Sequence, residues 1–352
     1  MTEERITSPS DDGDEARSDA ILRPRKLEDF VGQTELKEKL GVFIEAARQR
    51  GDALDHVLLY GPPGLGKTTL AHIIAEELEV PIKVTSGPAF QNAAELLGVL
   101  SHIEARQAVF IDEVHRLPRV LEEHLYQAMD SLKCELIVDK GPNARHYTLN
   151  LEPFTLVGAT TRAGMITAPL RDRFGVVFRL DFYSPDELAT IVRRSAGILG
   201  IDITDDGATE IARRSRGTPR IANRLLKRTR DFAQVRGQAV VDREAADYAL
   251  ERLQVDIRGL DEMDRRILLA IVQKFGGGPV GLGSLAVSVS EEAETIEDVY
   301  EPFLIQLGFL QRTSRGRVAT PLAMTHLGIA GGAPGGAGDG PGGDAGETPR
   351  LL

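Results

Sequence analysis

The octapeptide GPPGLGKT, residues 61–68, constrains the possible fold more than any other stretch of the chain. It follows the apolar run HVLLY directly and leads into TTLAHIIAEEL, which has helical spacing. In the pattern G-x-x-x-x-G-K-[ST], Gly64 and Gly66 let backbone N–H groups approach phosphates, Lys67 adds a cation, and the helix N-terminus adds partial positive charge. The sequence therefore predicts a strand, a phosphate-binding loop and a helix.

Three further residues belong to this loop. Gly61 opens it, Thr68 would ligate Mg²⁺ through its hydroxyl, and Thr69 lies where a further phosphate contact is possible. ATP with Mg²⁺ is the expected ligand.

A second stretch, AVFIDEVH at 108–115, ends an apolar run with two acids. Asp112 is predicted to hold the metal ion through its water shell, and Glu113 to polarise the attacking water. The run FTLVGATT then brings Thr160 and Thr161 to a neighbouring strand end, where they either sense the γ-phosphate or are ordinary turn threonines.

Two arginine-containing stretches follow. In PLRDRFG, residues 169–175, Arg171 and Arg173 either offer charge to the nucleotide of a neighbouring subunit or form a surface salt bridge with Asp172. In RGTPRIANRLL, Arg220 stands one residue after Pro219, at the start of a predicted helix, and fits a lid contact to the γ-phosphate.

The order of the elements predicts an α/β fold with additional units. Short apolar runs alternate with helical segments between 55 and 182, which indicates a parallel sheet covered on both faces. Helices are then predicted, with Asp205 or Asp206 as an N-cap, at 186–198, 205–215, 219–236 and 242–252. A third unit begins near Asp256, with helices around 261–275 and 291–306 and a hairpin in GFLQRTSRGRVATP. The predicted segments are a disordered acidic tail (1–20), a P-loop domain (21–183), a helical domain (184–255), a head (256–330) and a disordered Gly/Pro-rich tail (331–352).

The net charge of -11 is unevenly distributed. The two tails carry -5 and -2, so the body retains only -4 and has room for a locally basic face. QRTSRGR, residues 311–317, gathers Arg312, Arg315 and Arg317. It is either a soluble basic turn or a grip on nucleic-acid phosphates.

Other sequence features exclude several classes. No apolar run approaches the roughly 20 residues of a membrane helix, and the first twenty residues lack the apolar core of a signal peptide. We therefore expect a cytoplasmic protein with no membrane contact. The single Cys134 excludes an internal disulfide, and the seven histidines show neither HExxH nor Cys/His pairing.

In this order, the motifs resemble those of AAA+ ATPases. LRPRKLEDFVGQ, GATTRAG, PLRDRFG and RGTPRIANRLL together are similar to the RuvB family of Holliday-junction branch-migration motors, over roughly residues 21–330. The resemblance implies an AAA+ P-loop parallel-sheet domain, a small all-helical lid and a winged-helix head. It also implies a homohexamer that ATP drives along double-stranded DNA in recombination, DNA repair and the SOS response, acting with RuvA at the junction and with RuvC.

The same resemblance implies roles for individual residues. Leu22, Arg23 and Tyr183 would form the adenine-side pocket, Thr160 or Thr161 would be sensor 1, and Arg220 would be sensor 2. Arg173 becomes the favoured finger, with Arg171 nearby. The same subunit boundary would hold Asp130, Ser131 and Leu132.

The resemblance also implies two contact surfaces. Residues 135–151 would form a hairpin that meets RuvA. Arg312 and Arg317 match DNA-contacting positions of the family, while Arg315 is a weaker candidate. The chain departs from the family at Ala293, where an arginine is frequent, so one phosphate contact is missing or replaced.

Two other classes compete with the motor. An AAA+ clamp loader or initiator would use ATP as an assembly switch, but Glu113, Arg173 and Arg220 together favour turnover. A protein-remodelling AAA+ chaperone is disfavoured by the winged-helix-like end and by the absence of an obvious aromatic-Val-Gly pore loop.

Overall fold

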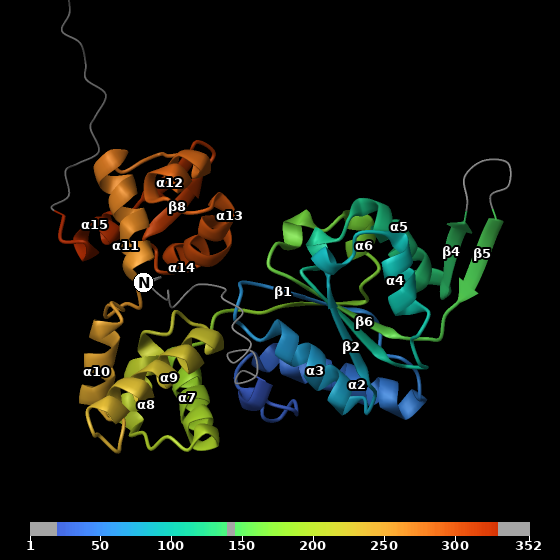
Figure 1. Cartoon of the computed structure of the whole chain (residues 1–352), viewed down its shortest axis with the longest axis horizontal. Helices are drawn as coiled ribbons and strands as arrows, with labels where there is room; N and C mark the ends of the chain where they lie inside the picture. The colour runs from blue at the N-terminus through green and yellow to red at the C-terminus, as the bar shows by residue number, and fades with distance from the viewer. Residues whose placement is uncertain (1–19, 139–144, 330–352) are drawn as a thin grey trace, which may run out of the picture. The chain divides into compact units, whose positions relative to one another are not determined.

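The computed structural model of the chain describes residues 20–138 and 145–329 (Figure 1). The predicted disordered tails and the tip of the predicted hairpin at 135–151 lie outside these residues. Contacts between Cα atoms divide the chain into two compact units, the first ending at Glu262 and the second beginning at Met263.

A five-stranded parallel sheet forms the centre of the first unit. Its strand order is β2-β3-β6-β1-β7. The strands are β1 (Val57–Tyr60), β2 (Ile82–Ser86), β3 (Ala108–Asp112), β6 (Thr155–Thr160) and β7 (Val176–Arg179). All five lie between residues 55 and 182, where short apolar runs alternate with helical segments in the sequence, so the predicted parallel sheet is confirmed.

Helices cover both faces of the sheet, as Figure 1 shows. One layer consists of α2 (Thr34–Arg50) and α3 (Lys67–Glu77), and the other of α4 (Ala93–Leu100), α5 (Arg119–Ser131) and α6 (Ala168–Arg171). Side chains alternate along each strand, so Leu59 packs into the core under the first layer while Leu58 packs into the core under the second. Three short 3₁₀ helices complete the connections: η1 (Gly87–Ala89), η2 (Val114–Arg116) and η3 (Ala163–Met165).

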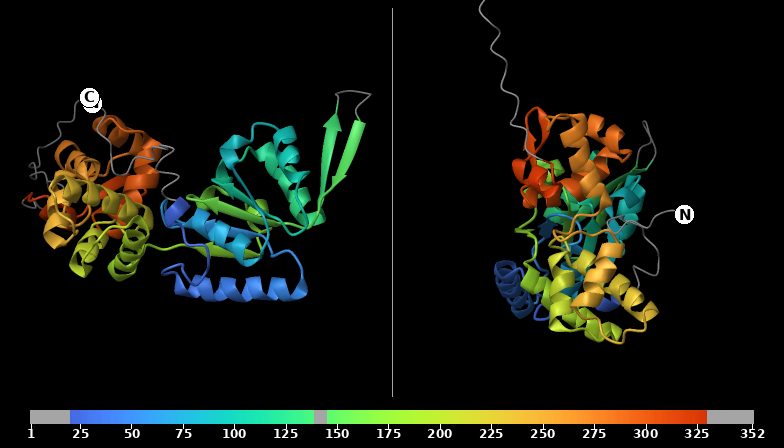
Figure 2. Two further views of the ribbon diagram at one scale, coloured as in Figure 1. Left: turned by 60° about the horizontal axis from the view of Figure 1, so that its bottom comes forward. Right: turned by 90° about the vertical axis from the view of Figure 1, so that its left-hand side faces the viewer.

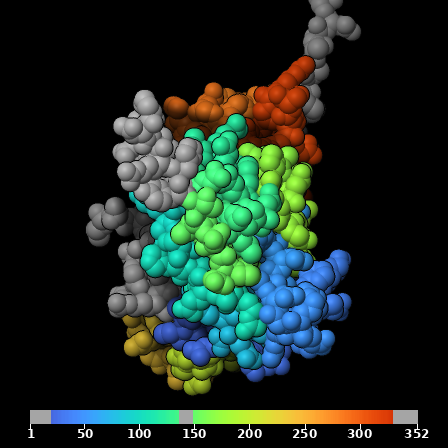
Figure 3. Space-filling model, turned by 90° about the vertical axis from the view of Figure 1, so that its right-hand side faces the viewer, coloured from blue at the N-terminus to red at the C-terminus, as the bar shows by residue number. Residues whose placement is uncertain are grey.

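An antiparallel hairpin extends from this domain beside α5. It pairs β4 (Lys133–Val138) with β5 (Arg145–Asn150). Figure 1 and the left view of Figure 2 show it projecting away from the sheet, and Figure 3 looks onto the face that carries it, with the hairpin in green. The predicted hairpin is therefore present.

Four helices follow the sheet within the first unit: α7 (Pro185–Leu199), α8 (Asp205–Arg213), α9 (Pro219–Val235) and α10 (Arg243–Arg252). Their buried side chains join the core under α2 and α3, so the helical domain is anchored to the sheet domain. The prediction that Asp205 or Asp206 caps α8 is wrong. Thr204 is the cap and accepts a hydrogen bond from the Gly207 N–H, which leaves both aspartates in the first turn.

The second unit packs helices around a two-stranded hairpin. Its helices are α11 (Glu262–Leu269), the π-helical η4 (Ala270–Lys274), α12 (Leu282–Val289), α13 (Ala293–Thr295), the π-helical η5 (Ile296–Tyr300), α14 (Glu301–Gln306) and α15 (Pro321–His326). The hairpin is formed by β8 (Leu310–Thr313) and β9 (Gly316–Ala319), as predicted. Sequence patterns did not indicate α12 or α15, because both are short.

Among the described residues, no helix has the length and apolar character needed to cross a membrane.

Candidate nucleotide-binding site

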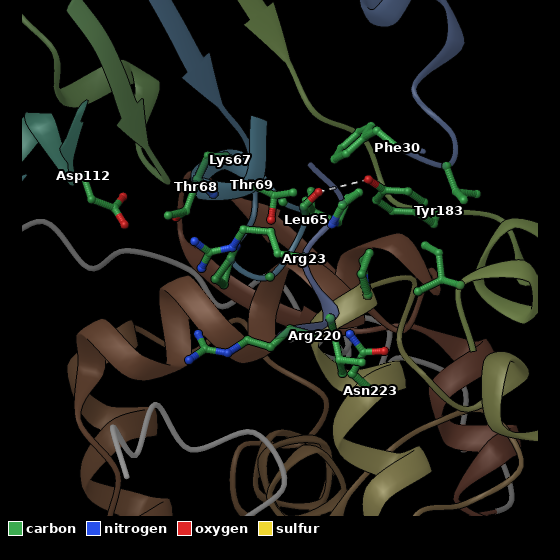
Figure 4. Close-up of a pocket in the computed structure, with 18 of the residues that line it drawn as sticks. Arg23, Phe30, Leu65, Lys67, Thr68, Thr69, Asp112, Tyr183, Arg220 and Asn223 are labelled. Atoms are coloured by element: carbon green, nitrogen blue, oxygen red, sulfur yellow. Dashed lines mark hydrogen bonds between the residues drawn. The ribbon is translucent and has the colours of Figure 1, made fainter. Parts of the chain in front are cut away.

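A cavity of about 570 Å³ opens at the carboxyl ends of the parallel strands, where the sheet domain meets the four-helix domain. Much of its lining comes from the segment before α2, the loop between β1 and α3, the end of β3, and the start of α9 (Figure 4). The ends of β2 and β6, the segment before α7 and α7 itself contribute further residues. Ligands of open parallel sheets bind at this edge because the loops that follow the strands converge there.

The loop between β1 and α3 makes two close approaches that only glycine permits. Gly66 has φ +101°, and a Cβ there would lie 3.2 Å from the Phe30 ring. Gly64 has φ +79°, and a Cβ there would lie 3.1 Å from the Cβ of Arg220. The loop is therefore enclosed between the segment before α2 and the first turn of α9.

Lys67 lies at the start of α3 and is buried. Its ammonium group donates hydrogen bonds to the carbonyl oxygens of Gly61 at 2.7 Å and Pro62 at 2.8 Å. Burial lowers the pKa of Lys67 to about 8, while Asp112 and Glu113 act in the opposite direction. A cation held only by neutral carbonyls keeps its charge for an anion that enters the cavity.

Two acids lie opposite this lysine, at the end of β3. Burial raises the pKa of Asp112 above its ordinary value, although hydrogen bonds from the Glu113 backbone and the Thr68 side chain, and the charge of Lys67, oppose this shift. The Glu113 N–H donates to Asp112 Oδ1 at 2.9 Å. The carboxylate of Glu113 is half-exposed and accepts from Arg116 at 3.1 Å. Both acids therefore flank the cavity but have different partners.

The oxygen donors at this end of the cavity suit Mg²⁺, which is usually held by few protein ligands together with water and phosphate oxygens. Thr68 and Asp112 supply hydroxyl and carboxylate oxygens, which are hard ligands of the kind Mg²⁺ prefers. No group of three His, Cys, Asp or Glu suited to a metal occurs among the described residues. A Mg²⁺ ion here would need water and phosphate oxygens to complete its coordination.

The two threonines after β6 have different environments. Thr160 is fully buried, and its hydroxyl lies 2.9 Å from His115 Nδ1 and accepts from the Arg162 N–H at 3.0 Å. Thr161 instead lines the cavity. Thr161 is therefore placed for direct contact with a ligand, whereas Thr160 supports the end of the strand.

The four-helix domain closes the other side of the cavity. Arg220 at the start of α9 lines it, and the Arg220 N–H lies 3.4 Å from the Gly64 carbonyl oxygen. Tyr183 is buried and donates from its hydroxyl to the Leu65 carbonyl at 3.1 Å (Figure 4). Burial raises the pKa of Tyr183. Both contacts attach the lid to the phosphate-binding loop.

Leu22 and Arg23 come from the segment before α2 and line the same cavity. The Leu22 carbonyl accepts a hydrogen bond from Arg194 at 2.8 Å, so α7 also fixes this segment. Sequence reasoning missed several lining residues, of which Phe30, Arg194 and Asn223 are examples. Phe30 belongs to the quoted stretch LRPRKLEDFVGQ, and its aromatic side chain was the available signal.

A separate cluster holds Arg173, which does not line the cavity. Its guanidinium bonds Asp130 at 2.6 and 2.8 Å, donates to the Pro169 carbonyl at 2.7 Å, and lies 4.5 Å from the centre of the Tyr126 ring. Arg173 therefore forms a salt bridge, but with Asp130 and not with Asp172 as the sequence alternative had it.

Three other predicted boundary residues, Arg171, Ser131 and Leu132, also lie outside the cavity lining. Arg171 ends α6, while Ser131 and Leu132 follow Asp130 at the end of α5. These elements pack against each other, so the predicted set lies together on one part of the domain.

Comparison with known proteins agrees with this architecture. Three family models match in succession: the Holliday junction DNA helicase RuvB P-loop domain over residues 22–180, the RuvB AAA lid domain over 183–256, and the RuvB C-terminal winged helix domain over 257–328. Together they span most of the chain. The chain belongs to the RuvB family.

Solved structures of the RuvB family superpose on most of the chain. The Thermotoga maritima RuvB Holliday junction branch migration motor is 47% identical, with a TM-score of 0.83 over 89% of this chain and 100% of that one. A single-substitution variant of the T. maritima protein is also 47% identical, with a TM-score of 0.83 over 88% of this chain and 99% of that one. The fold is thus the RuvB fold: a P-loop parallel-sheet domain, a lid and a winged-helix domain.

The winged-helix unit of this RuvB-family chain carries the three predicted DNA-contact residues on its β8–β9 hairpin. Arg312 and Arg317 are partners in the antiparallel register, and Arg315 lies in the turn between the strands. Strand alternation would place 315 and 317 on one face, but the turn interrupts it. A third chain segment joins the hairpin through an isolated antiparallel bridge between Val280 and Arg317.

Proposed function

We propose that the chain is an ATP-hydrolysing motor that pulls double-stranded DNA and thereby drives branch migration of Holliday junctions. One observation carries this proposal. Lys67, Asp112 and Glu113 of the sheet domain converge with Arg220 of the lid on a single cavity. Membership of the RuvB family supports the same function.

Within the cavity, the residues divide the work on ATP. Lys67 leaves the carbonyls of Gly61 and Pro62 to bind phosphate, and Gly64 and Gly66 give the phosphates access to backbone N–H groups. Thr69 adds a phosphate contact. Glu113 leaves Arg116 to orient and polarise water, and Thr161 contacts the γ-phosphate while Thr160 holds the strand end.

Thr68 and Asp112 would hold Mg²⁺. Held there, the ion would supply positive charge to the phosphate oxygens.

The base and the lid complete the site. Leu22 and Arg23 bind on the adenine side and Tyr183 closes this end, since its hydroxyl already contacts the phosphate-binding loop. Arg220 reaches the γ-phosphate as sensor 2. Hydrolysis then changes the contact between Arg220 and the loop, and the lid rotates.

A neighbouring protomer supplies the remaining charge in a homohexameric ring. Arg173 acts in trans as the finger, with Arg171 close to the same nucleotide. Asp130, Ser131 and Leu132 form part of this boundary. The exclusion of Arg173 from its own cavity supports this assignment, because an arginine needed for hydrolysis must then act elsewhere.

The remaining surfaces serve DNA and partner proteins. Arg312, Arg315 and Arg317 grip backbone phosphates, which carry no sequence information and so suit movement along any sequence. The hairpin at 135–151 meets RuvA at the junction, and RuvC acts downstream in recombination and repair. The protein works in the cytoplasm.

A junction assay separates the motor from an ATP-dependent assembly switch. We expect duplex DNA to stimulate ATP hydrolysis, and RuvA with ATP to support strand exchange on a four-way junction. Glu113→Gln should still bind ATP and lose both activities. Robust turnover without junction movement, or full junction movement by Glu113→Gln, would instead favour the switch.

A further inference from the structure

The β8–β9 hairpin at residues 310–319, which we call the wing, holds two of its arginines among carboxylates. Arg317 donates to Glu301 from Nε at 2.6 Å and from Nη2 at 3.3 Å, and Nη2 also lies 3.7 Å from Glu297. Arg312 pairs with Glu297 and also lies 3.4 Å from Glu301. The two guanidinium groups are therefore matched by two carboxylates, and we call these four residues the wing quartet.

Burial divides the wing quartet into an inner and an outer pair. The side chain of Glu301 is 1% exposed and that of Arg317 is 12% exposed. The corresponding values are 28% for Glu297 and 52% for Arg312. Breaking the inner pair would leave a buried charge without its main partner, whereas the outer pair can be exchanged for contacts with solvent ions.

The carboxylates of the wing quartet belong to a strongly acidic segment. Residues 291–306 contain six acidic residues and no lysine or arginine. This segment forms α13, η5 and α14, which immediately precede the wing. The negative charge of this segment repels a DNA backbone. Phosphate contact in this part of the head must therefore come from the wing arginines.

We propose that Glu297 is an internal competitor of DNA phosphate for Arg312. In the free head, the Glu297 carboxylate occupies the guanidinium face that a phosphate would take. DNA must displace it, while Glu301 keeps Arg317 in place as the fixed base of the wing. The proposal rests on the proposed function, because it assumes that the wing grips the DNA backbone.

The competition makes the DNA contact of Arg312 weak and reversible. A head that moves along DNA must release each phosphate that it binds, and a carboxylate ready to take back the arginine lowers the cost of release. Arg315 differs, since its side chain is exposed and has no ion-pair partner among the described residues. It is therefore the contact that Glu297 does not control.

The test measures binding of the full chain, with ATP and Mg²⁺, to a fluorescently labelled duplex over a range of salt concentrations. Glu297→Gln should bind roughly two- to fivefold more tightly than the wild type, the range expected from removing an exposed ion-pair partner. The slope of log K against log salt should be steeper by up to about one unit, because Glu297 no longer competes for Arg312 and the phosphate contact of this arginine is made in full.

A matched control separates a specific effect from a general change in charge. Glu292 is an exposed acid of the same segment, and it is not a member of the wing quartet. Glu292→Gln removes the same charge and should leave the affinity within about twofold of wild type. An equal gain from both variants would overturn the proposal.

A double-mutant cycle tests whether the effect passes through Arg312. If Glu297 acts by competing for Arg312, the gain from Glu297→Gln should disappear in an Arg312→Ala background. A gain that persists there, or no gain in the single variant, contradicts the inference. If the wild type does not bind duplex, or if Arg312→Ala and Arg315→Ala bind as well as wild type, the proposed wing function itself fails.

Discussion

Two regions of the molecule hold buried or half-buried cations in opposite ways. In the nucleotide cavity, Lys67 donates to the neutral carbonyls of Gly61 and Pro62. In the wing, Arg312 and Arg317 bond the carboxylates of Glu297 and Glu301. The cavity therefore keeps a positive charge for its ligand, whereas the wing pairs two of its three arginines with carboxylates before DNA arrives.

This difference matches the two kinds of binding that the proposed motor needs. A triphosphate must be held with fixed geometry for hydrolysis, and a reserved charge in a partly dry site provides strong attraction. The DNA backbone must be gripped and released repeatedly, for which a neutralised surface is better suited. Arg173 is intermediate, because it is paired with Asp130 on the surface of its own protomer.

The largest expected effect is the loss of ATP turnover when Arg173 is removed. Arg173→Ala should lower ATP turnover by about 10³-fold or more, since an arginine supplied to the transition state contributes on that scale. Rings mixed from variant and wild-type subunits should lose more activity than the wild-type fraction predicts. Phosphate release at fixed total protein measures both, and Arg179→Ala, an exposed ion-paired arginine of β7, is the control. Full hydrolysis by a pure Arg173→Ala ring would rule out the trans role.

Removing the positive charge of Lys67 from the cavity should also reduce turnover strongly. Lys67→Met keeps much of the side-chain volume and removes the cation, so hydrolysis should fall by about 10²- to 10³-fold, as when one stabilising donor is lost from an active site. Lys39→Met, at an exposed lysine paired with Glu35, should retain wild-type turnover. If turnover in Lys67→Met fell less than tenfold, Lys67 would not be a charge held for the nucleotide phosphates.

The buried ion pair between Arg317 and Glu301 predicts that removing the arginine destabilises the head. Arg317→Ala leaves Glu301 buried without its main partner, which should lower the opening free energy of the head by about 3 kcal/mol. Hydrogen exchange of β8, β9 and α14 in the full chain reports that opening. Arg315→Ala, at the exposed turn, should leave the exchange rates unchanged. Equal exchange in both variants would show that the inner pair does not hold the wing.

A further effect is a pH dependence of the empty cavity. The pKa of Lys67 is about 8 when folded and 10.5 ordinarily, so between these values the unfolded chain binds more protons. Stability of the nucleotide-free protein should therefore rise as pH increases from about 8 to 10.5. Nucleotide affinity should fall over the same range, by at most about tenfold per pH unit. Both trends should vanish in Lys67→Met, measured by thermal unfolding and by titration with a fluorescent nucleotide.

Much of the fold was predictable because local patterns and the sheet agree. The apolar runs bounded by turn residues correspond to β1, β2, β3, β6 and β7. Parallel strands bring their carboxyl ends to one edge, which is why Lys67 and Asp112, far apart in sequence, line one cavity. Other predictions failed by a residue or two, as with the cap of α8, because Thr204 and Asp205 are both good capping residues.

The sequence by itself determined the chemistry of the protein: a phosphate-binding loop, a pair of acids after a buried strand, and an arginine-rich hairpin. Only the tertiary structure decided which threonine faces the cavity, that Arg173 meets Asp130, and that Glu297 and Glu301 pair with wing arginines. The physical reason is that residue type and spacing fix what a side chain can bond. The partner it does bond depends on segments that packing brings together, and no local pattern encodes those.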